Sequence, residues 1–241
     1  MPATHETWTV MPHDPLRHID EGILTVTGNV HMPLTDLQRR MTVVRLHDRR
    51  LVVYSAIALA EPAMAQLESL GVPSFLVVPG AHHRLDAKPW KERYPSMVVI
   101  APPSARAAVE QVVAVDATNA DFGDPRVLLV PVSGTNGHEL ALVVRRASGT
   151  TIVVSELIGN MTDGDGFKGW LLRRMGYAGD EPRIPTWAKM KVIENADALR
   201  DQLIAWASFD SLRRVIVSHG EIIDQNPTSK LRDLAKGLAQ S

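Results

Sequence analysis

Apolar residues fall in short runs along this chain, and most runs are rich in valine, isoleucine or leucine, the pattern of buried strands. Amphipathic stretches with helix-start and helix-stop residues separate many of these runs. In the first half, the pattern predicts strands at 23–27, 41–46, 51–57, 75–79 and 97–101, and helices at 61–70, 88–94 and 104–113. The strands 41–46 and 51–57 flank the turn-like sequence HDRR, which predicts a hairpin.

In the second half, the same pattern predicts strands at 126–132, 138–146, 150–155 and 213–218, and helices at 167–176, 196–209 and 226–239. Two stretches rich in glycine, aspartate or proline, 160–169 and 177–187, are predicted to be long loops. No low-complexity segment and no Pro/Ser-rich linker divides the sequence. We therefore expect residues 1–241 to form a single domain with an α/β order of elements.

Composition narrows the chemistry that this chain can perform. Of its 241 residues 45% are hydrophobic, which is enough to bury a sizeable core. The 26 Lys and Arg residues nearly balance the 27 Asp and Glu residues, so no overall field favours nucleic acid or anionic lipid as a partner. The chain has no cysteine, which excludes thiolate nucleophiles, disulfides and cysteine-ligated zinc. A metal ion would have to be bound by His, Asp or Glu.

The sequence carries no recognisable address for export or membrane insertion. Its start, MPATHETWTV, lacks the basic and then apolar order of a signal peptide. The longest apolar run, LVVYSAIALA, is far shorter than the roughly 20 residues that span a bilayer. We expect a cytoplasmic protein with a small-molecule substrate as its partner, and neither nucleic acid nor a membrane.

Three of the predicted strands end in similar polar residues. The strand FLVVP leads to His82 and His83, TIVVS leads to Glu156, and VIVS leads to His219. In open α/β sheets, ligands bind beyond the carboxyl ends of the strands, so two imidazoles and one carboxylate can meet there. Such a set suits Zn(II) or Fe(II) and leaves coordination positions for water and substrate. The alternative is that each side chain makes a local hydrogen bond at its strand end.

The order of these segments resembles the metallo-β-lactamase superfamily. More narrowly, it resembles a family of unassigned function within that superfamily, whose pattern includes RMTVVRL, a proline before a histidine pair, a Trp-to-Tyr-Pro segment (here Trp90 to Tyr94 and Pro95), a strand with an acidic end and a late His-Gly. The resemblance covers roughly residues 20–235. The fold class that it implies is α/β (α+β), an αββα sandwich of two mixed sheets flanked by helices.

The first metal-binding motif of the superfamily, H-x-H-x-D-H, is depleted in this chain. His82 matches its second histidine, whereas Gly80, Arg84 and Leu85 stand where two further histidines and the aspartate would be. A cation at Arg84 would repel a second metal ion. The resemblance therefore implies a reduced site with one metal ion.

The remaining ligands come from the later strands. The resemblance places Glu156 where the superfamily has its bridging aspartate, and His219 where it has its final histidine. The predicted metal ligands are thus His82, Glu156 and His219, with His83 as a further candidate. Neighbouring histidines in an extended chain point in different directions, so we expect only one of the pair to bind, and the motif favours His82.

Such a site implies a metal-dependent hydrolase with one zinc or iron ion. Glu156, if not bound to the metal, could accept a proton from the attacking water, and the guanidinium of Arg84 would favour an anionic substrate. Asp86 could pair locally with Arg84. The alternative function is a metal-free, non-catalytic protein of the same fold that binds a small ligand or a protein partner.

Overall fold

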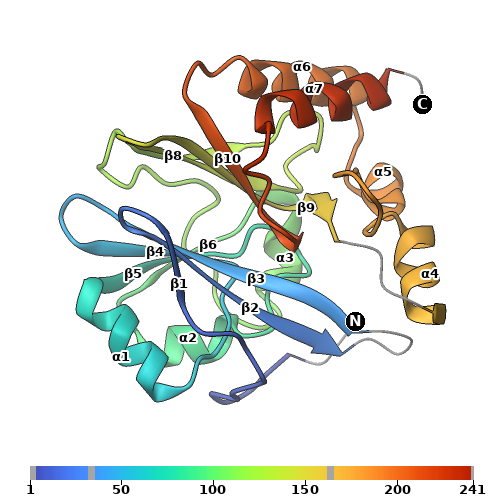
Figure 1. Cartoon of the computed structure of the whole chain (residues 1–241). Coiled ribbons are helices and arrows are strands. Elements are labelled where there is room, and N and C mark those ends of the chain that lie inside the picture. The colour runs from blue at the N-terminus through green and yellow to red at the C-terminus, as the bar shows by residue number, and fades with distance from the viewer. Residues whose placement is uncertain (1–3, 32–35, 162–165, 240–241) are drawn as a thin grey trace. The chain divides into compact units, whose positions relative to one another are not determined.

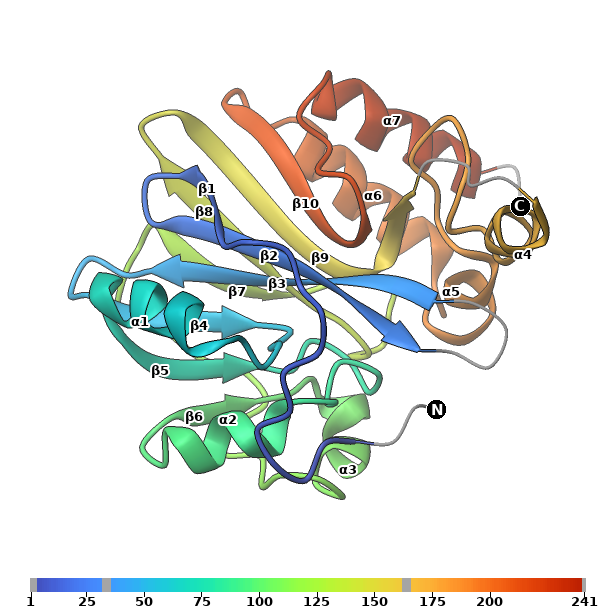
Figure 2. The ribbon, with the colours of Figure 1, turned by 60° about the horizontal axis from the view of Figure 1, so that its bottom comes forward.

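A computed structural model of the chain describes residues 4–31, 36–161 and 166–239 (Figures 1 and 2). The chain forms two compact units, residues 1–127 and 128–241. Each unit contains a mixed β-sheet and its own helices. A single domain over residues 1–241 stays a prediction.

The first unit is built on a six-stranded sheet in which the strands follow one another in chain order. Its strands are β1 Arg17–Asp20, β2 Ile23–His31, β3 Asp36–Arg45, β4 Arg50–Tyr54, β5 Val72–Val77 and β6 Val98–Ile100. Strands β1 to β4 pair antiparallel, and β4, β5 and β6 pair parallel. Because parallel strands need a crossover connection, a helix lies between β4 and β5 in the sequence, and another between β5 and β6.

Helices of the first unit cover one face of this sheet. They are α1 Glu61–Leu70, α2 Ala87–Arg93, the 3₁₀ turn η1 Pro103–Ala105 and α3 Arg106–Val109. Side chains from all of them share one apolar core with alternate residues of the strands, including Met64, Trp90 and Val109. Gly71 ends α1, and a Cβ there would lie 1.9 Å from the carbonyl oxygen of Arg49. Glycine is needed at this point because only a residue without a side chain allows so close an approach.

The second unit has a four-stranded sheet in the order β10-β9-β8-β7. Its strands are β7 Val127–Pro131, which starts at the last residue of the first unit, β8 Leu140–Arg146, β9 Gly149–Asn160 and β10 Leu212–Gly220. Strands β8 and β9 form an antiparallel hairpin, whereas β9 and β10 are parallel. The connection between β9 and β10 carries three helices: α4 Gly166–Met175, α5 Thr186–Lys191 and α6 Ala196–Ala207.

Helices α6 and α7 cover one face of this second sheet (Figure 2). Helix α7, Pro227–Leu238, follows β10 and packs beside α6. Leu203 and Trp206 of α6 and Leu231 of α7 join Val154 of β9 and Val217 of β10 in a common core. The core fixes the two parallel strands whose ends carry the candidate site.

Most predicted elements are present, and the main differences concern β1, α5, α3 and β9. Strand β1 and helix α5 were not predicted, since β1 has only four residues and α5 lies in the proline-bearing stretch expected to be a loop. Helix α3 is much shorter than the predicted helix 104–113. Strand β9 does not end before Glu156 but continues to Asn160.

Across the described ranges, no helix is both long and apolar enough to cross a membrane.

Candidate functional site

Glu156 and His219 lie together in the second unit. Both side chains are buried, and Oε2 of Glu156 lies 3.7 Å from Nε2 of His219. Sequence reasoning expected these two residues to gather because each follows the carboxyl end of an apolar strand, and the structure brings them together on the parallel strands β9 and β10. An imidazole and a carboxylate side by side and shielded from water can share a proton or bind one cation.

A bulge in β9 makes this contact. Val154 pairs with Val217, but the next pair joins Gly159 to His219. Residues 155–158 of β9 therefore stand opposite Ser218 alone. A bulge of this kind frees a side chain from strict alternation and re-aims it, so Glu156 can face His219 although the two residues are not register partners.

The ends of the two strands are clamped beyond the bulge. The amide of Glu221 donates to the carbonyl of Asn160, and the Asn160 side chain donates to the carbonyl of Glu221, both at 2.8 Å. Gly220 has φ of 102°, and a Cβ there would lie 2.0 Å from the Asn160 carbonyl oxygen. The His-Gly sequence therefore has a steric cause, since glycine lets β10 approach β9 directly after His219.

Tyr177 completes the group with a phenol. Its hydroxyl lies 3.5 Å from Oε2 of Glu156, and its ring meets the ring of His219 edge to face, with centroids 5.2 Å apart. Burial, and then the negative charge of Glu156 and the hydrogen bond to it, raise the pKa of Tyr177. The side chain therefore remains a neutral hydrogen-bond donor at physiological pH.

A second carboxylate lies behind the bulge. Glu139 is 1% exposed and directly precedes β8, and its Oε1 accepts the backbone N–H of Ser155 at 2.7 Å. Burial raises the pKa of Glu139 to about 7, and the charge of Glu156 adds to this, while hydrogen bonds from Ser155 and Leu157 oppose it. Near neutral pH this side chain is thus partly protonated.

Sequence reasoning missed Tyr177 and Glu139. Tyr177 lies in the stretch expected to be a long loop, and nothing in its neighbourhood marks it as special. Glu139 carried a usable signal, because an acidic residue directly before an apolar strand is rarely buried without a specific partner. The sequence HELALVV shows that arrangement.

The histidine pair belongs to the first unit, in the turn that follows β5. His82 is exposed, and His83 is buried. Nδ1 of His83 lies 2.6 Å from Oγ of Ser55, at the end of β4. Ser55 holds a left-handed backbone conformation, with φ of 57°, and its amide donates to the carbonyl of Val77. This local anchoring fixes the ring of His83 in the first unit.

Arg84 and Asp86 do not pair with each other. Arg84 donates through Nη1 to the carbonyl of Ala108 and to Oε1 of Gln111, the latter at 3.1 Å, and so ties the turn to the end of α3. Asp86 is fully buried and accepts from Nη2 of Arg39 at 2.6 Å, with Nδ1 of His5 2.7 Å from its other oxygen. The predicted role of Arg84 toward an anionic substrate stays a prediction.

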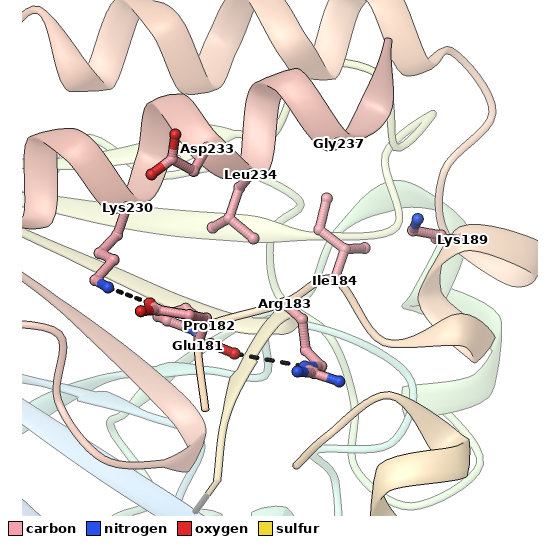
Figure 3. A pocket seen from close by; sticks show the side chains of 9 residues that line it. All are labelled: Glu181, Pro182, Arg183, Ile184, Lys189, Lys230, Asp233, Leu234 and Gly237. Carbon is pink, nitrogen blue, oxygen red and sulfur yellow. Dashed lines mark hydrogen bonds and ion pairs between the residues drawn. The ribbon is translucent and has the colours of Figure 1, made fainter. Parts of the chain in front are cut away.

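A cavity of about 400 Å³ opens elsewhere in the second unit, between α7 and the segment before α5 (Figure 3). Leu234 and Ile184 point into it, and Lys230 of α7 pairs with Glu181 at its edge. Its lining residues do not include Glu156, His219 or Tyr177. The cavity is therefore distinct from the buried group described above.

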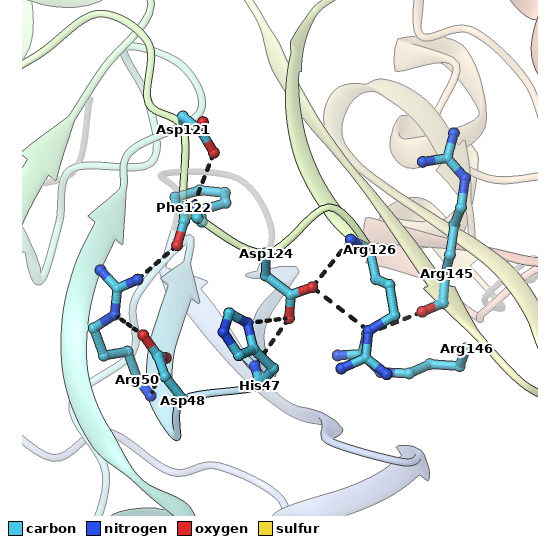
Figure 4. A network of polar contacts seen from close by, with 10 residues as sticks. His47, Asp48, Arg50, Asp121, Phe122, Asp124, Arg126, Arg145 and Arg146 are labelled. Carbon is cyan, nitrogen blue, oxygen red and sulfur yellow. Dashed lines mark hydrogen bonds and ion pairs between the residues drawn. The ribbon is translucent and has the colours of Figure 1, made fainter.

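In the first unit a further polar network has a structural role (Figure 4). Asp124 is buried and accepts the backbone amides of His47 at 2.9 Å and Arg126 at 3.0 Å. Burial tends to raise the pKa of Asp124, but these hydrogen bonds and the charge of Arg126 outweigh it and lower the pKa. The network holds the turn between β3 and β4 to the segment that leads to β7.

The donor atoms of the second unit fit a borderline metal ion. Zinc and iron accept imidazole nitrogen and carboxylate oxygen together, and Glu156 and His219 offer one of each within 3.7 Å. Tyr177 adds a neutral hydrogen-bond donor beside Glu156. Two protein ligands alone hold such ions weakly, so a third would have to be supplied.

Comparisons with known proteins identify the fold. No protein-family model matches the chain, and no curated protein matches it in sequence. Solved structures do match over nearly the whole chain. The metallo-β-lactamase FIM-1 from Pseudomonas aeruginosa, in its mono-zinc form, has a TM-score of 0.58 and 14% identity, with 95% of this chain and 98% of that one covered. The chain has the metallo-β-lactamase fold.

Two further solved structures agree. A metallo-β-lactamase from Erythrobacter litoralis has a TM-score of 0.61 and 15% identity, with 92% of this chain and 96% of that one covered. The metallo-β-lactamase DIM-1 has a TM-score of 0.62 and 12% identity, with 94% and 99% covered. The predicted fold class, α+β with two mixed sheets and flanking helices, is confirmed. At these identities the likeness concerns the metallo-β-lactamase fold and not the substrate.

Proposed function

We propose that this chain is a metal-dependent hydrolase with a reduced site that holds one zinc or iron ion. The observation that carries the proposal is the buried contact between Glu156 and His219 at 3.7 Å, on a fold of which one solved member is in a mono-zinc form. In this proposal Glu156 and His219 are ligands, and a histidine of the pair His82 and His83 is the third.

Of the two histidines, we favour His83 as that ligand, although the motif alone favours His82. A metal-binding imidazole usually donates its other ring N–H to a neighbouring acceptor, which fixes the tautomer and the ring orientation. Nδ1 of His83 has such a neighbour in Oγ of Ser55 at 2.6 Å, which would make Nε2 the ligand atom. His82 is exposed, so an ordered ligand position there would require its ring to lose mobility on binding.

A bound ion would lower the pKa of its water toward neutrality and polarise the substrate oxygen. The side chains of the chain itself supply three further functions. Glu156 can accept a proton through the oxygen not bound to the metal. The Tyr177 hydroxyl donates a hydrogen bond to Glu156 and orients it, and the Tyr177 ring packs edge to face with the ring of His219. We propose esters, lactones, amides or phosphoesters as the substrate class.

Metal analysis of purified protein tests this proposal. After refolding with zinc or iron, we expect about one equivalent to be retained, and the variants Glu156→Ala, His219→Ala and His83→Ala to lose it. His82→Ala and His138→Ala are matched controls and should retain the metal. Retention by all three ligand variants, or less than a tenth of an equivalent in the unaltered protein, would remove the proposal.

A metal-free binding protein is the alternative function. The same contacts also favour this alternative, because Glu156 lies close to both His219 and the Tyr177 hydroxyl without an added ion. In that case metal content stays below a tenth of an equivalent, and Glu156→Gln has no effect on the hydrolysis of chromogenic esters or phosphodiesters.

A further inference from the structure

At the bulge of β9, the side chain of Glu139 replaces the backbone partner that a neighbouring strand would supply. The backbone register of β8 on β9 runs from Arg146 and Gly149 to Leu142 and Val153 and then stops. Two residues further along β9, the amide of Ser155 donates to a side-chain oxygen of Glu139 instead of a backbone carbonyl, at 2.7 Å. A side chain thus satisfies the amide at the point where the bulge starts.

The position of Glu139 is itself fixed by the backbone. Its own carbonyl accepts the amide of Val132, at 3.1 Å, just beyond the end of β7. The backbone of Glu139 is thus bonded to Val132 after β7, while its side chain is bonded to Ser155 at the bulge of β9.

A buried carboxyl group is a costly acceptor for backbone amides. Glu139 is 1% exposed, and among the described residues its Oε2 has no hydrogen-bond partner. A buried polar atom left without a partner reduces stability, so this arrangement is not explained by stability alone. Costly buried polar groups tend to occur where function requires a specific geometry. Here the adjacent residue whose orientation is at stake is Glu156, directly after Ser155.

We propose that Glu139 is a positioning residue, which holds segment 155–158 in the bulged shape that aims Glu156 at His219. The inference deepens the proposed function and rests on it for its catalytic meaning. The positioning itself concerns only the second unit. It predicts that the reach of the acceptor oxygen matters and that its charge does not.

Three substitutions separate reach from charge. Glu139→Gln keeps a carbonyl oxygen at the same distance and should bind Zn²⁺ within about 3-fold of the unaltered protein. Glu139→Leu removes the acceptor and should weaken Zn²⁺ binding about 10- to 100-fold, the range found when residues that orient metal ligands are replaced. Glu139→Asp keeps the charge but shortens the reach, and should behave like the leucine variant.

A matched control distinguishes positioning from general destabilisation. Thr135→Val removes another fully buried hydrogen bond of the second unit, from Oγ1 to the carbonyl of Val132 at 2.7 Å. It should lower Tm and leave Zn²⁺ affinity unchanged. Equal weakening by Thr135→Val, or an aspartate variant that binds better than the glutamine variant, would overturn the proposal. The second comparison holds even if Glu139→Leu does not fold.

A metal-free readout keeps this test separate from the proposed function. In zinc-free protein we expect a nuclear Overhauser contact between the Glu156 side chain and the His219 ring, retained in Glu139→Gln and lost in Glu139→Asp. If the unaltered protein binds no Zn²⁺ but these contacts follow that order, the hydrolase proposal fails and the positioning role stands. Contacts that survive in Glu139→Asp would refute the positioning role alone.

Discussion

At the scale of single residues, two carboxyl groups close to the same bulge have different surroundings. Glu156 faces an imidazole and a phenol, whereas Glu139 is enclosed and accepts hydrogen bonds from the backbone of β9. Burial without a cation raises the pKa of Glu139 to about 7, from an ordinary value of 4.5. Charge can therefore reside on Glu156 while Glu139 stays partly neutral, which limits repulsion between them.

This pKa makes the stability of the metal-free protein depend on pH. Because the pKa is higher in the folded than in the unfolded state, the stabilising contribution is full below about pH 4.5, falls as pH rises, and is lost above about pH 7. The difference corresponds to about 3 kcal/mol. We expect Glu139→Gln to lose this dependence, so that its free energy of unfolding relative to the unaltered protein increases by that amount between pH 4.5 and 8.

Urea unfolding with EDTA present measures this directly. Other groups titrate over the same range, and the comparison of the two proteins removes their common effect. Thr135→Val should follow the pH dependence of the unaltered protein. Parallel curves for Glu139→Gln and the unaltered protein would show that Glu139 does not titrate in this range.

At the scale of elements, the first unit depends on a buried ion group that joins three segments. Asp86 at the start of α2 binds Arg39 of β3 and His5 of the N-terminal segment. We expect Asp86→Ala to reduce the free energy of unfolding by about 3–5 kcal/mol, because the buried Arg39 would lose its counter-charge. Asp86→Asn, which keeps an acceptor oxygen, should cost less than Asp86→Ala, as measured by chemical denaturation. Equal losses would mean that packing and not charge pairing sets the effect.

The elements also show what could be predicted from sequence. Long apolar strands and capped helices, such as β9 and α1, follow from periodicity and from Pro62 and Gly71, which are local signals. The contact of Glu156 with His219 was predictable because both follow apolar strand runs. The bulge was not, since it depends on the register between β9 and β10, which has no local signature, and on the partner that the Glu139 carboxyl group finds in β9.

At the scale of the whole molecule, the metallo-β-lactamase fold accounts for the order of elements but not for the donor set. The chain lacks most residues of the superfamily's first metal-binding motif. The solved structures share only 12–15% of their residues with it, so their likeness does not extend to the metal ligands. The function therefore depends on whether a reduced set of ligands holds a metal ion. The second unit supplies Glu156 and His219 for such a set, supported by Glu139 and Tyr177.

X-ray absorption of the zinc-loaded protein tests that claim most directly, because it counts the ligands of the bound ion. We expect one zinc ion with two imidazole nitrogens and carboxylate oxygen around it in the unaltered protein. His219→Ala, which we expect to lose the metal, should give no such zinc spectrum. A spectrum without imidazole ligands, or one that His219→Ala leaves unchanged, would contradict the account.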